Sequence, residues 1–217
     1  MTWLPAWLGE AYCTLYLRLG RTFSASEAGR VLHVTPGKAN LILSMLARHG
    51  WLRREAKGVY CPVEPEEVVR KVAIMNEVRK NLGEIPQRGY AGVLARFMEL
   101  AVERYGERLM SAVVFGSVAR GDATPTSDID LLLVIEGLPE PLGTRYAEAA
   151  ELKRELYGSP EYVENLLRGL SSPVSLVLLT PDEARGFHSV YLDMTLHRRV
   201  LYDGDGFMME VLSRLSE

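Results

Sequence analysis

Two pairs of residues near the middle of the chain have the types and spacing that chemistry requires. Gly116 and Ser117 follow the apolar run SAVVF, and after ten further residues Asp128 and Asp130 stand at alternate positions at the start of DIDLLLVI. Strand alternation points both carboxylates to one face of a sheet and Ile129 to the other. Two like charges this close raise each other's pKa unless a cation lies between them. Hard carboxylate oxygens suit Mg²⁺, or the similar Mn²⁺.

The Gly-Ser pair predicts an anion site beside these carboxylates. Gly116 lets the backbone approach a ligand closely, and Ser117 opens a helix with free N–H groups and a hydroxyl. Residues 118–127 are typical of a short helix and a loop. Mg²⁺ is commonly held by one or two carboxylates together with substrate phosphates, so the pattern predicts a nucleotide phosphate. A simpler interpretation, in which Ser127-Asp128 only caps a loop, leaves the Gly-Ser pair and the second aspartate unexplained.

At these residues the sequence resembles the DNA polymerase β-like nucleotidyltransferase superfamily, particularly its minimal, stand-alone members in bacteria and archaea. The family pattern is Gly-Ser, ten residues, then Asp-x-Asp, and the two pairs match it. Arg120-Gly121-Asp122, Ser127 and the hydrophobic run after Asp130 match as well. The resemblance covers residues 91–217, and its most specific part lies between residues 113 and 134.

The resemblance implies an activity and a fold. The activity is transfer of a nucleoside monophosphate from an NTP to an acceptor, with pyrophosphate leaving and metals clamping the attacking and leaving oxygens. Asp128 and Asp130 would bind the metals and carry catalysis. Gly116 and Ser117 would hold the β and γ phosphates, with Arg120 a weaker candidate for the same task. The implied fold is an α/β (α+β) domain with a mixed sheet flanked by helices.

One departure from the family pattern puts the activity in doubt. Active members usually carry a third carboxylate on a later strand, and the strand PVSLVLLT places Ser175 at that position. Serine brings no negative charge, so the metal on the acceptor side should be held more weakly than the nucleotide-bound one. Nucleotide binding could survive while transfer slows or stops.

Other acids near the C-terminus have simpler explanations. Asp182 and Glu183 follow Thr180-Pro181, which is typical of a helix start with a T-x-x-E capping box. Asp193 lies in a helical pattern, and the acids of YDGDG are typical turn residues after the strand RRVLY. We expect none of them to replace the third carboxylate.

The first 64 residues predict a winged helix-turn-helix domain. Three helices are expected. The first covers residues 6–20, the second lies in SASEAGRVLH, and the third runs from residue 36 to Gly50. The helix signals are Gly20 as a stop, the S-x-x-E box of Ser24 and Glu27, and the cap Thr35 before Pro36. WLRREAKGVYCPV then predicts two strands with a turn at Lys57-Gly58, which resembles a wing.

This domain is expected to bind DNA. The third helix would present Thr35, Lys38 and Asn40 to a major groove. The wing would bring basic side chains to phosphates, namely Arg53, Arg54 and Lys57. Residues 1–64 carry eight Lys/Arg against four Asp/Glu, whereas the remainder carries 17 against 24. Winged helices also dock proteins, and chance scatter of exposed charge remains an alternative for this asymmetry.

Residues 65–90 predict a linker helix. Apolar residues at helical spacing form a stripe before Gly83, Pro86 and Gly89 end the pattern; they are Val68, Val69, Val72, Met75 and Val78. Such a stripe must be buried, either against the second domain or against the same helix of another subunit, so the helix is also a candidate dimer element. The nucleotidyltransferase-like domain would then occupy residues 91–217.

Composition limits the remaining function classes. Nearly half of the residues are hydrophobic and 24% are charged, as in ordinary globular proteins. No apolar run reaches the length of a membrane span and no signal peptide is evident, so we expect a cytoplasmic protein without a membrane partner. Cys13 and Cys61 are isolated and are expected to be small core residues. The four histidines lack metal-ligand spacing, so we assign them no chemistry.

Three functions remain open at this point. The first is an active nucleotidyltransferase that modifies a protein, an RNA or a small molecule, with the winged helix recruiting the acceptor. The second is a DNA-binding regulator whose second domain senses NTP or has lost its chemistry. The third is an antitoxin-like protein that modifies or holds a partner toxin, an arrangement that the resemblance to minimal family members implies.

Overall fold

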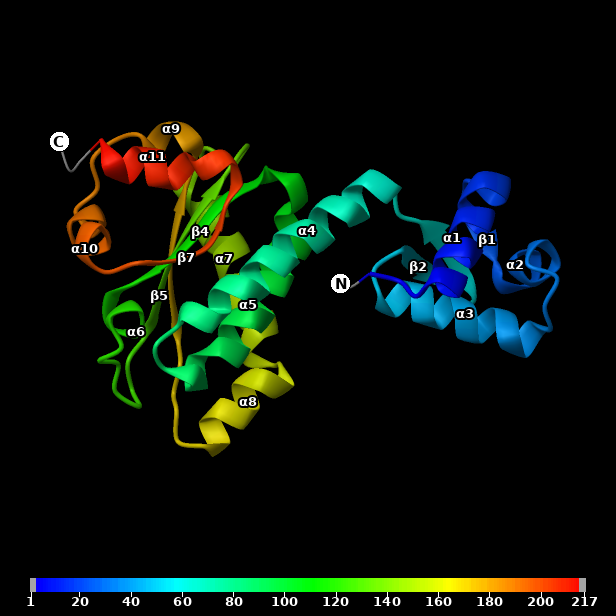
Figure 1. Ribbon diagram of the computed structural model, residues 1–217, viewed down its shortest axis with the longest axis horizontal. Helices are drawn as coiled ribbons and strands as arrows, with labels where there is room; N and C mark the ends of the chain where they lie inside the picture. The colour runs from blue at the N-terminus through cyan, green and yellow to red at the C-terminus, as the bar shows by residue number, and fades with distance from the viewer. Residues whose placement is uncertain (1–2, 215–217) are drawn as a thin grey trace. The chain divides into compact units, whose positions relative to one another are not determined.

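The computed structural model describes residues 3–214 and divides the chain into two compact units, Met1–Ala73 and Ile74–Glu217 (Figure 1). The division falls inside the predicted linker region. Within the described part of the chain, no helix combines the length and the apolar character that a membrane span needs.

The smaller unit has the predicted winged helix-turn-helix elements. Its helices are α1 (Ala6–Leu19), α2 (Ala25–Val31) and α3 (Pro36–Arg48), and its strands are β1 (Phe23–Ser24), β2 (Leu52–Ala56) and β3 (Val59–Pro62). The strands form an antiparallel sheet in the order β1-β3-β2. The predicted helix signals are confirmed, since Ser24 and Glu27 form the capping box and Thr35 caps α3. The short strand β1 was not predicted, because two residues carry no detectable alternation.

The predicted core role of the two cysteines was wrong. Cys13 is exposed and Cys61 is only partly buried. On α1, Leu8, Tyr12 and Leu15 take the buried face, and Cys13 follows Tyr12 by one position, so it points away from the core. A helical pattern indicates that one face is buried, but a small residue at its edge does not reveal its side.

The predicted linker helix is α4 (Pro65–Asn81), and most of its apolar stripe is buried within the chain. Val68 and Val72 join the hydrophobic core of the smaller unit. Met75 and Val78 join a core of the larger unit. Val69 is exposed, contrary to its predicted place in the buried stripe. Because intramolecular packing already covers these residues, the stripe no longer requires a second subunit.

The larger unit is built on a mixed four-stranded sheet, as predicted. Its strands are β4 (Leu109–Phe115), β5 (Ile129–Ile135), β6 (Val174–Leu179) and β7 (Arg199–Asp203). They lie in the order β6-β5-β4-β7, with β5 and β6 parallel and the other pairs antiparallel. The helices are α5 (Ala91–Tyr105), α6 (Gly116–Arg120), α7 (Leu142–Tyr157), α8 (Pro160–Leu167), α9 (Pro181–Ala184), α10 (Val190–Leu196) and α11 (Phe207–Ser213).

Helices cover both faces of this sheet (Figure 1). One core contains residues of α5, α7 and α8 with Leu131 and Leu133 of β5. The other contains residues of α9, α10 and α11 with Leu132 and Val134. Because side chains alternate along a strand, Asp130 shares the face of Leu132, which is the face that α10 covers.

Candidate functional site

The site begins where β4 ends and the chain turns into α6. Phe115 is paired with Asp130 across the antiparallel β4–β5 ladder, which brings Gly116 against the Asp130 side chain. Gly116 has a φ of +67°, and a Cβ atom there would lie 2.2 Å from Oδ2 of Asp130. Glycine is therefore required for both its backbone conformation and the space it leaves.

The two predicted aspartates lie at the start of β5. Asp130 is half-buried within the strand, whereas Asp128 is exposed and precedes it, since β5 begins at Ile129. Burial raises the pKa of Asp130, a hydrogen bond from Ser175 opposes this effect, and the negative charges of Asp128 and Asp193 raise the pKa further. Two negative charges thus act on the Asp130 carboxylate, an arrangement that a bound cation would stabilise.

Ser175 lies where the family resemblance expects the third carboxylate. Parallel pairing of β5 and β6 places it opposite Asp130, and its hydroxyl is hydrogen-bonded to that carboxylate. Among residues 3–214, no group of three or more His, Cys, Asp or Glu side chains is suited to holding a metal ion. The donors present, Asp128 and Asp130, fit Mg²⁺ only as partial ligands that nucleotide phosphates would complete.

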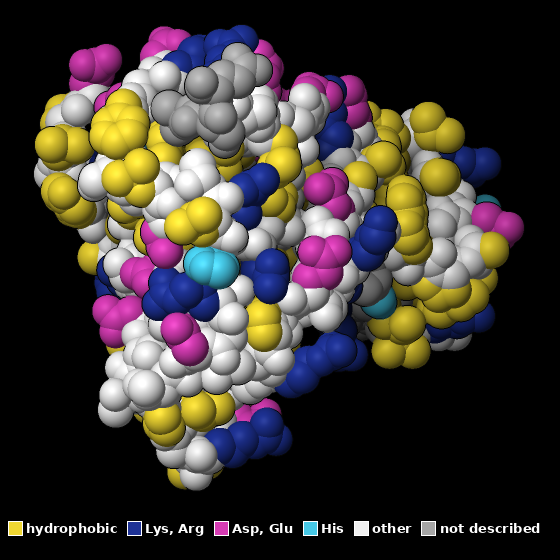
Figure 2. All heavy atoms as spheres, turned by 60° about the vertical axis from the view of Figure 1, so that its left-hand side comes forward, with side chains coloured by type: hydrophobic (Ala, Val, Ile, Leu, Met, Phe, Trp, Pro, Cys, Tyr) yellow, Lys and Arg dark blue, Asp and Glu magenta, His cyan; other side chains and the backbone are white. Residues whose placement is uncertain are grey.

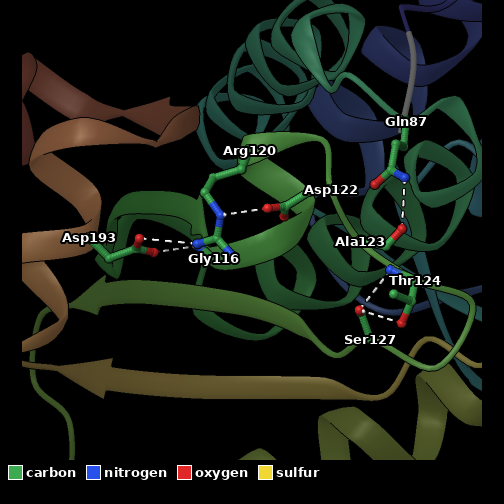
Figure 3. Close-up of polar contacts among 8 residues, drawn as sticks. All are labelled: Gln87, Gly116, Arg120, Asp122, Ala123, Thr124, Ser127 and Asp193. Carbon is green, nitrogen blue, oxygen red and sulfur yellow. Dashed lines mark hydrogen bonds and ion pairs between the residues drawn. The ribbon is translucent and has the colours of Figure 1, made fainter.

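One residue of this site, Asp193 on α10, was not predicted from the sequence. Its carboxylate accepts a hydrogen bond from the Gly116 N–H at 2.9 Å. It also forms a salt bridge with Arg120, whose Nη1 donates to it over 3.1 Å (Figure 3). Arg120 also donates from Nε to Asp122 over 3.2 Å. Asp193 lies 77 positions after Gly116 in a short helix without a motif. Only the packing of α10 on the sheet brings these residues together.

The loop between α6 and β5 is fixed by the segment that precedes α5. Gln87 donates to the Ala123 carbonyl over 2.9 Å, and the Tyr90 hydroxyl donates to the Thr124 carbonyl over 2.9 Å. Within the loop, the Thr124 N–H donates to the Ser127 hydroxyl over 2.8 Å (Figure 3). Ser127 thus has the local capping role that the simpler interpretation assigned to it. That role holds the loop and leaves the aspartates to be explained separately.

The structure supports the helix-start interpretation of the later acids. Thr180 and Glu183 form the predicted capping box at α9. Glu183 also binds the buried Arg145 guanidinium at 2.7 and 2.9 Å, which holds the pKa of Glu183 below its usual range. Asp203 accepts hydrogen bonds from the N–H groups of Met208 and Met209 in the first turn of α11. These carboxylates have structural partners.

The predicted DNA-contacting residues lie on the surface of the smaller unit. On and just before α3, Thr35, Lys38 and Asn40 are exposed. In the wing, Arg53, Arg54 and Lys57 are exposed, and Gly58 forms the turn with a φ of +75°. Arg53 is paired with Glu55 at 2.7 Å. That ion pair reduces the positive charge that Arg53 offers to a phosphate.

The surface beside α10 is partly hydrophobic. On the side of the larger unit that carries α9–α11, hydrophobic side chains gather at the surface (Figure 2). On α10 itself, Leu192 is 62% exposed and Leu196 is 78% exposed, while Tyr191 and Met194 are fully buried. Tyr191 and Met194, on one face of α10, therefore anchor this helix in the core of the larger unit.

Comparisons with known proteins bear on both units. Residues 95–188 match the family described as "Nucleotidyltransferase domain". Residues 15–63 match the family described as "Transcriptional regulator, AbiEi antitoxin". A protein of Methanocaldococcus jannaschii named "Putative protein adenylyltransferase" is 27% identical over 123 residues, which cover 57% of this chain and 78% of that protein.

Two solved structures also show a likeness. A crystal structure of a toxin–antitoxin with AMP-PNP has a TM-score of 0.34 at 18% identity, covering 56% of this chain and 85% of that chain. A mutant of the MntA-HpeT toxin–antitoxin has a TM-score of 0.33 at 18% identity, covering 55% of this chain and 83% of that chain. The two matched families agree with the resemblance in the Gly116–Asp130 stretch and with the winged-helix elements. The chain therefore contains a polymerase β-like nucleotidyltransferase domain, preceded by an AbiEi antitoxin-like transcriptional-regulator domain.

Proposed function

We propose that this protein binds an NTP with Mg²⁺ and transfers its nucleoside monophosphate to an acceptor. The observation that carries the proposal is the packing of Gly116 against Asp130, with Asp128 beside it. A glycine held this close to a carboxylate pair places a backbone N–H, which can donate to a polyanion, beside ligands for the cation that the polyanion brings. The match of residues 95–188 to a nucleotidyltransferase family supports the same reaction class.

The residues of the chain would share this task. Asp128 and Asp130 would hold Mg²⁺ or Mn²⁺, which when bound would neutralise phosphate charge and stabilise the leaving pyrophosphate. The Gly116 N–H, the Ser117 hydroxyl and the Arg120 guanidinium would bind the phosphates. The place of Asp130 within β5 and its partial burial would fix the carboxylate in position, as preorganised sites require.

A protein is the acceptor that we favour, with ATP as the donor. This choice rests on the name of the relative from Methanocaldococcus jannaschii, a protein adenylyltransferase. The exposed hydrophobic residues of α10 support it, because exposed apolar surface commonly marks protein docking. The winged helix would recruit the acceptor or bind DNA.

The test is label transfer from α-labelled ATP in the presence of Mg²⁺, with cell protein as the acceptor pool. We expect Asp128→Asn and Asp130→Asn each to reduce transfer by about a hundredfold or more, as losses of charge-stabilising groups do. Asp205→Asn is the matched control, because Asp205 is an exposed turn residue with a φ of +54° that Asn tolerates. Transfer that persists in both site variants would refute the proposal.

A second function is favoured by Ser175. With serine opposite Asp130, the domain would bind nucleotide without efficient transfer, and the chain would act as a DNA-binding regulator that senses NTP. The match of residues 15–63 to transcriptional regulators supports this alternative. It predicts nucleotide binding without label transfer, together with a change in DNA affinity when Mg-NTP is added.

A third function follows from the same family description, which includes an antitoxin. An antitoxin-like protein would form a stable complex with the product of a neighbouring gene. Copurification of that product with the full chain would support it, and recovery of the chain alone after coexpression would count against it.

A further inference from the structure

Asp193 occupies the groups that the proposed function assigns to phosphate. One carboxylate oxygen accepts from the Gly116 N–H at 2.9 Å and the other accepts from Arg120 at 3.1 Å (Figure 3). A phosphate presents oxygens of the same charge and acceptor character to the same donors. A carboxylate and a phosphate cannot both hold these two donors at full strength.

Neither local charge balance nor metal binding explains the position of Asp193. Arg120 already has a carboxylate partner in Asp122, which is 64% exposed and lies two residues away. The charge of Asp193 also raises the pKa of Asp130, so the two carboxylates repel each other. Within residues 3–214, Asp193 joins no cluster of three side chains that could hold a metal ion. What stabilises it is the pair of donors that it shares with the proposed phosphate site.

The helix that carries Asp193 is anchored without it. Tyr191 and Met194 are fully buried in the second core, and the Tyr191 hydroxyl donates to the Ala184 carbonyl over 2.8 Å. Arg198 donates to the Met194 carbonyl over 3.1 Å at the C-terminal end of α10. The Asp193 side chain is itself 37% exposed. A change of rotamer would therefore release Gly116 and Arg120 while the helix stays in place.

We propose that Asp193 is a further residue of the nucleotide site, where its carboxylate competes with the triphosphate for Gly116 and Arg120. This inference rests on the proposed function and deepens it. It makes Asp193 a residue that sets nucleotide affinity: Mg-NTP must displace it, and nucleotides with fewer phosphate oxygens displace it less effectively.

The test is calorimetric titration of the full chain with Mg-ATP, Mg-tripolyphosphate and adenosine. We expect Asp193→Asn and Asp193→Ala each to bind Mg-ATP and Mg-tripolyphosphate about tenfold more tightly than the native protein does, since a competing charge-assisted hydrogen bond is lost. Adenosine, which has no phosphate, should bind equally to all forms. Thermal unfolding of the same samples shows whether each variant is folded, and the asparagine variant preserves the shape of the side chain.

The matched control is Asp122→Asn, which removes the other carboxylate of Arg120 and leaves Gly116 untouched. We expect its affinity for Mg-tripolyphosphate to change by less than about threefold, as for an exposed ion pair. An equal gain in Asp122→Asn would overturn the inference, because the effect would then come from the Arg120 charge alone. If both Asp193 variants bind Mg-ATP as the native protein does, or more weakly, the inference is also overturned. The proposed function would still stand if the native protein binds Mg-ATP and Asp130→Asn does not. Absence of binding in every form would refute the proposed function as well.

Discussion

Ser175 lies opposite Asp130 in the parallel pairing of β5 and β6, and its hydroxyl is hydrogen-bonded to the Asp130 carboxylate. The family resemblance expects an acidic residue here. In this chain a neutral donor stabilises the carboxylate that a third acid would repel. The half-buried Asp130 carboxylate is therefore stabilised before any cation binds. In exchange, the site lacks the third carboxylate as a metal ligand.

Restoring the acid should alter both stability and activity. Ser175→Asp places a third carboxylate beside Asp130, so without Mg²⁺ we expect the free energy of unfolding to fall by about 1–3 kcal/mol. Mg²⁺ should recover this loss, and label transfer from Mg-ATP should rise by about tenfold or more. Urea unfolding with and without Mg²⁺, alongside the transfer assay, measures both effects.

The control for that variant is Ser213→Asp, which adds the same charge at an exposed position of α11. Its unfolding should not depend on Mg²⁺. If Ser175→Asp shows no greater Mg²⁺ dependence than Ser213→Asp, Ser175 does not adjoin a metal site.

The raised pKa of Asp130 predicts how stability depends on pH. Between the ordinary value of 3.8 and the raised value, the folded protein binds more protons than the unfolded chain. The free energy of unfolding therefore falls as pH rises through this window. Asp130→Asn removes the titration, so in EDTA the variant should exceed the native protein in stability at pH 7, by no more than about 1 kcal/mol after solvent screening.

That difference should disappear below the ordinary pKa of an aspartate. Urea unfolding from pH 3 to pH 8, the range that spans the ordinary aspartate pKa, provides the measurement, with Asp205→Asn as the control for loss of a carboxylate outside the site. A variant that is less stable than the native protein at pH 7 would show that the Ser175 hydrogen bond outweighs the cost of burial.

Gly116 should tolerate no side chain. Gly116→Ala forces a methyl group to within 2.2 Å of Oδ2 of Asp130 at a φ of +67°. We therefore expect the free energy of unfolding to fall by about 1–3 kcal/mol. We also expect the variant to lose Mg-ATP binding. Gly92→Ala is the control, because Gly92 lies exposed in α5, where an added Cβ would meet no neighbouring group within 4 Å and a helical alanine is favourable. Equal stability of the two variants would contradict the described geometry.

The wing predicts a specific effect of charge on DNA binding. Lys57→Ala should weaken DNA binding. It should also reduce the steepness of log K against log salt by about 0.9, the contribution of one phosphate contact. Glu55→Ala should strengthen binding several-fold, because it releases Arg53 from its ion pair at 2.7 Å. Lys80→Ala, an exposed lysine in the C-terminal half of α4, is the control. If Lys38→Ala and Lys57→Ala both leave DNA affinity unchanged, the proposed DNA-binding face is wrong.

Local signals predicted much of this fold. Capping boxes at Ser24 and Thr180, the glycine stop at Gly20 and the Lys57-Gly58 turn depend on neighbouring residues, and all of them are present. The spacing of Gly116, Ser117, Asp128 and Asp130 also lies within one strand–helix–loop–strand segment. Such features are encoded within a few residues, so a single sequence reveals them.

Features that depend on tertiary packing could not be predicted. Asp193 reaches Gly116 only because α10 packs on the sheet face that Asp130 shares, and nothing near Asp193 in the sequence indicates that face. Val69 fits the apolar stripe of α4 but is exposed, because the hydrophobic cores of the two units bury other residues of that helix. Pairing of β6 beside β5, which sets Ser175 opposite Asp130, is likewise a long-range result.

The proposed function depends above all on Asp128 and Asp130 forming a working site for a metal-bound nucleotide. The most direct test is calorimetric titration of Mg-ATP into native protein, Asp128→Asn and Asp205→Asn, repeated in EDTA. We predict Mg²⁺-dependent binding by the native protein and Asp205→Asn, and a loss of about tenfold or more in affinity for Asp128→Asn. Equal binding by all three proteins, or binding that EDTA does not weaken, would contradict it.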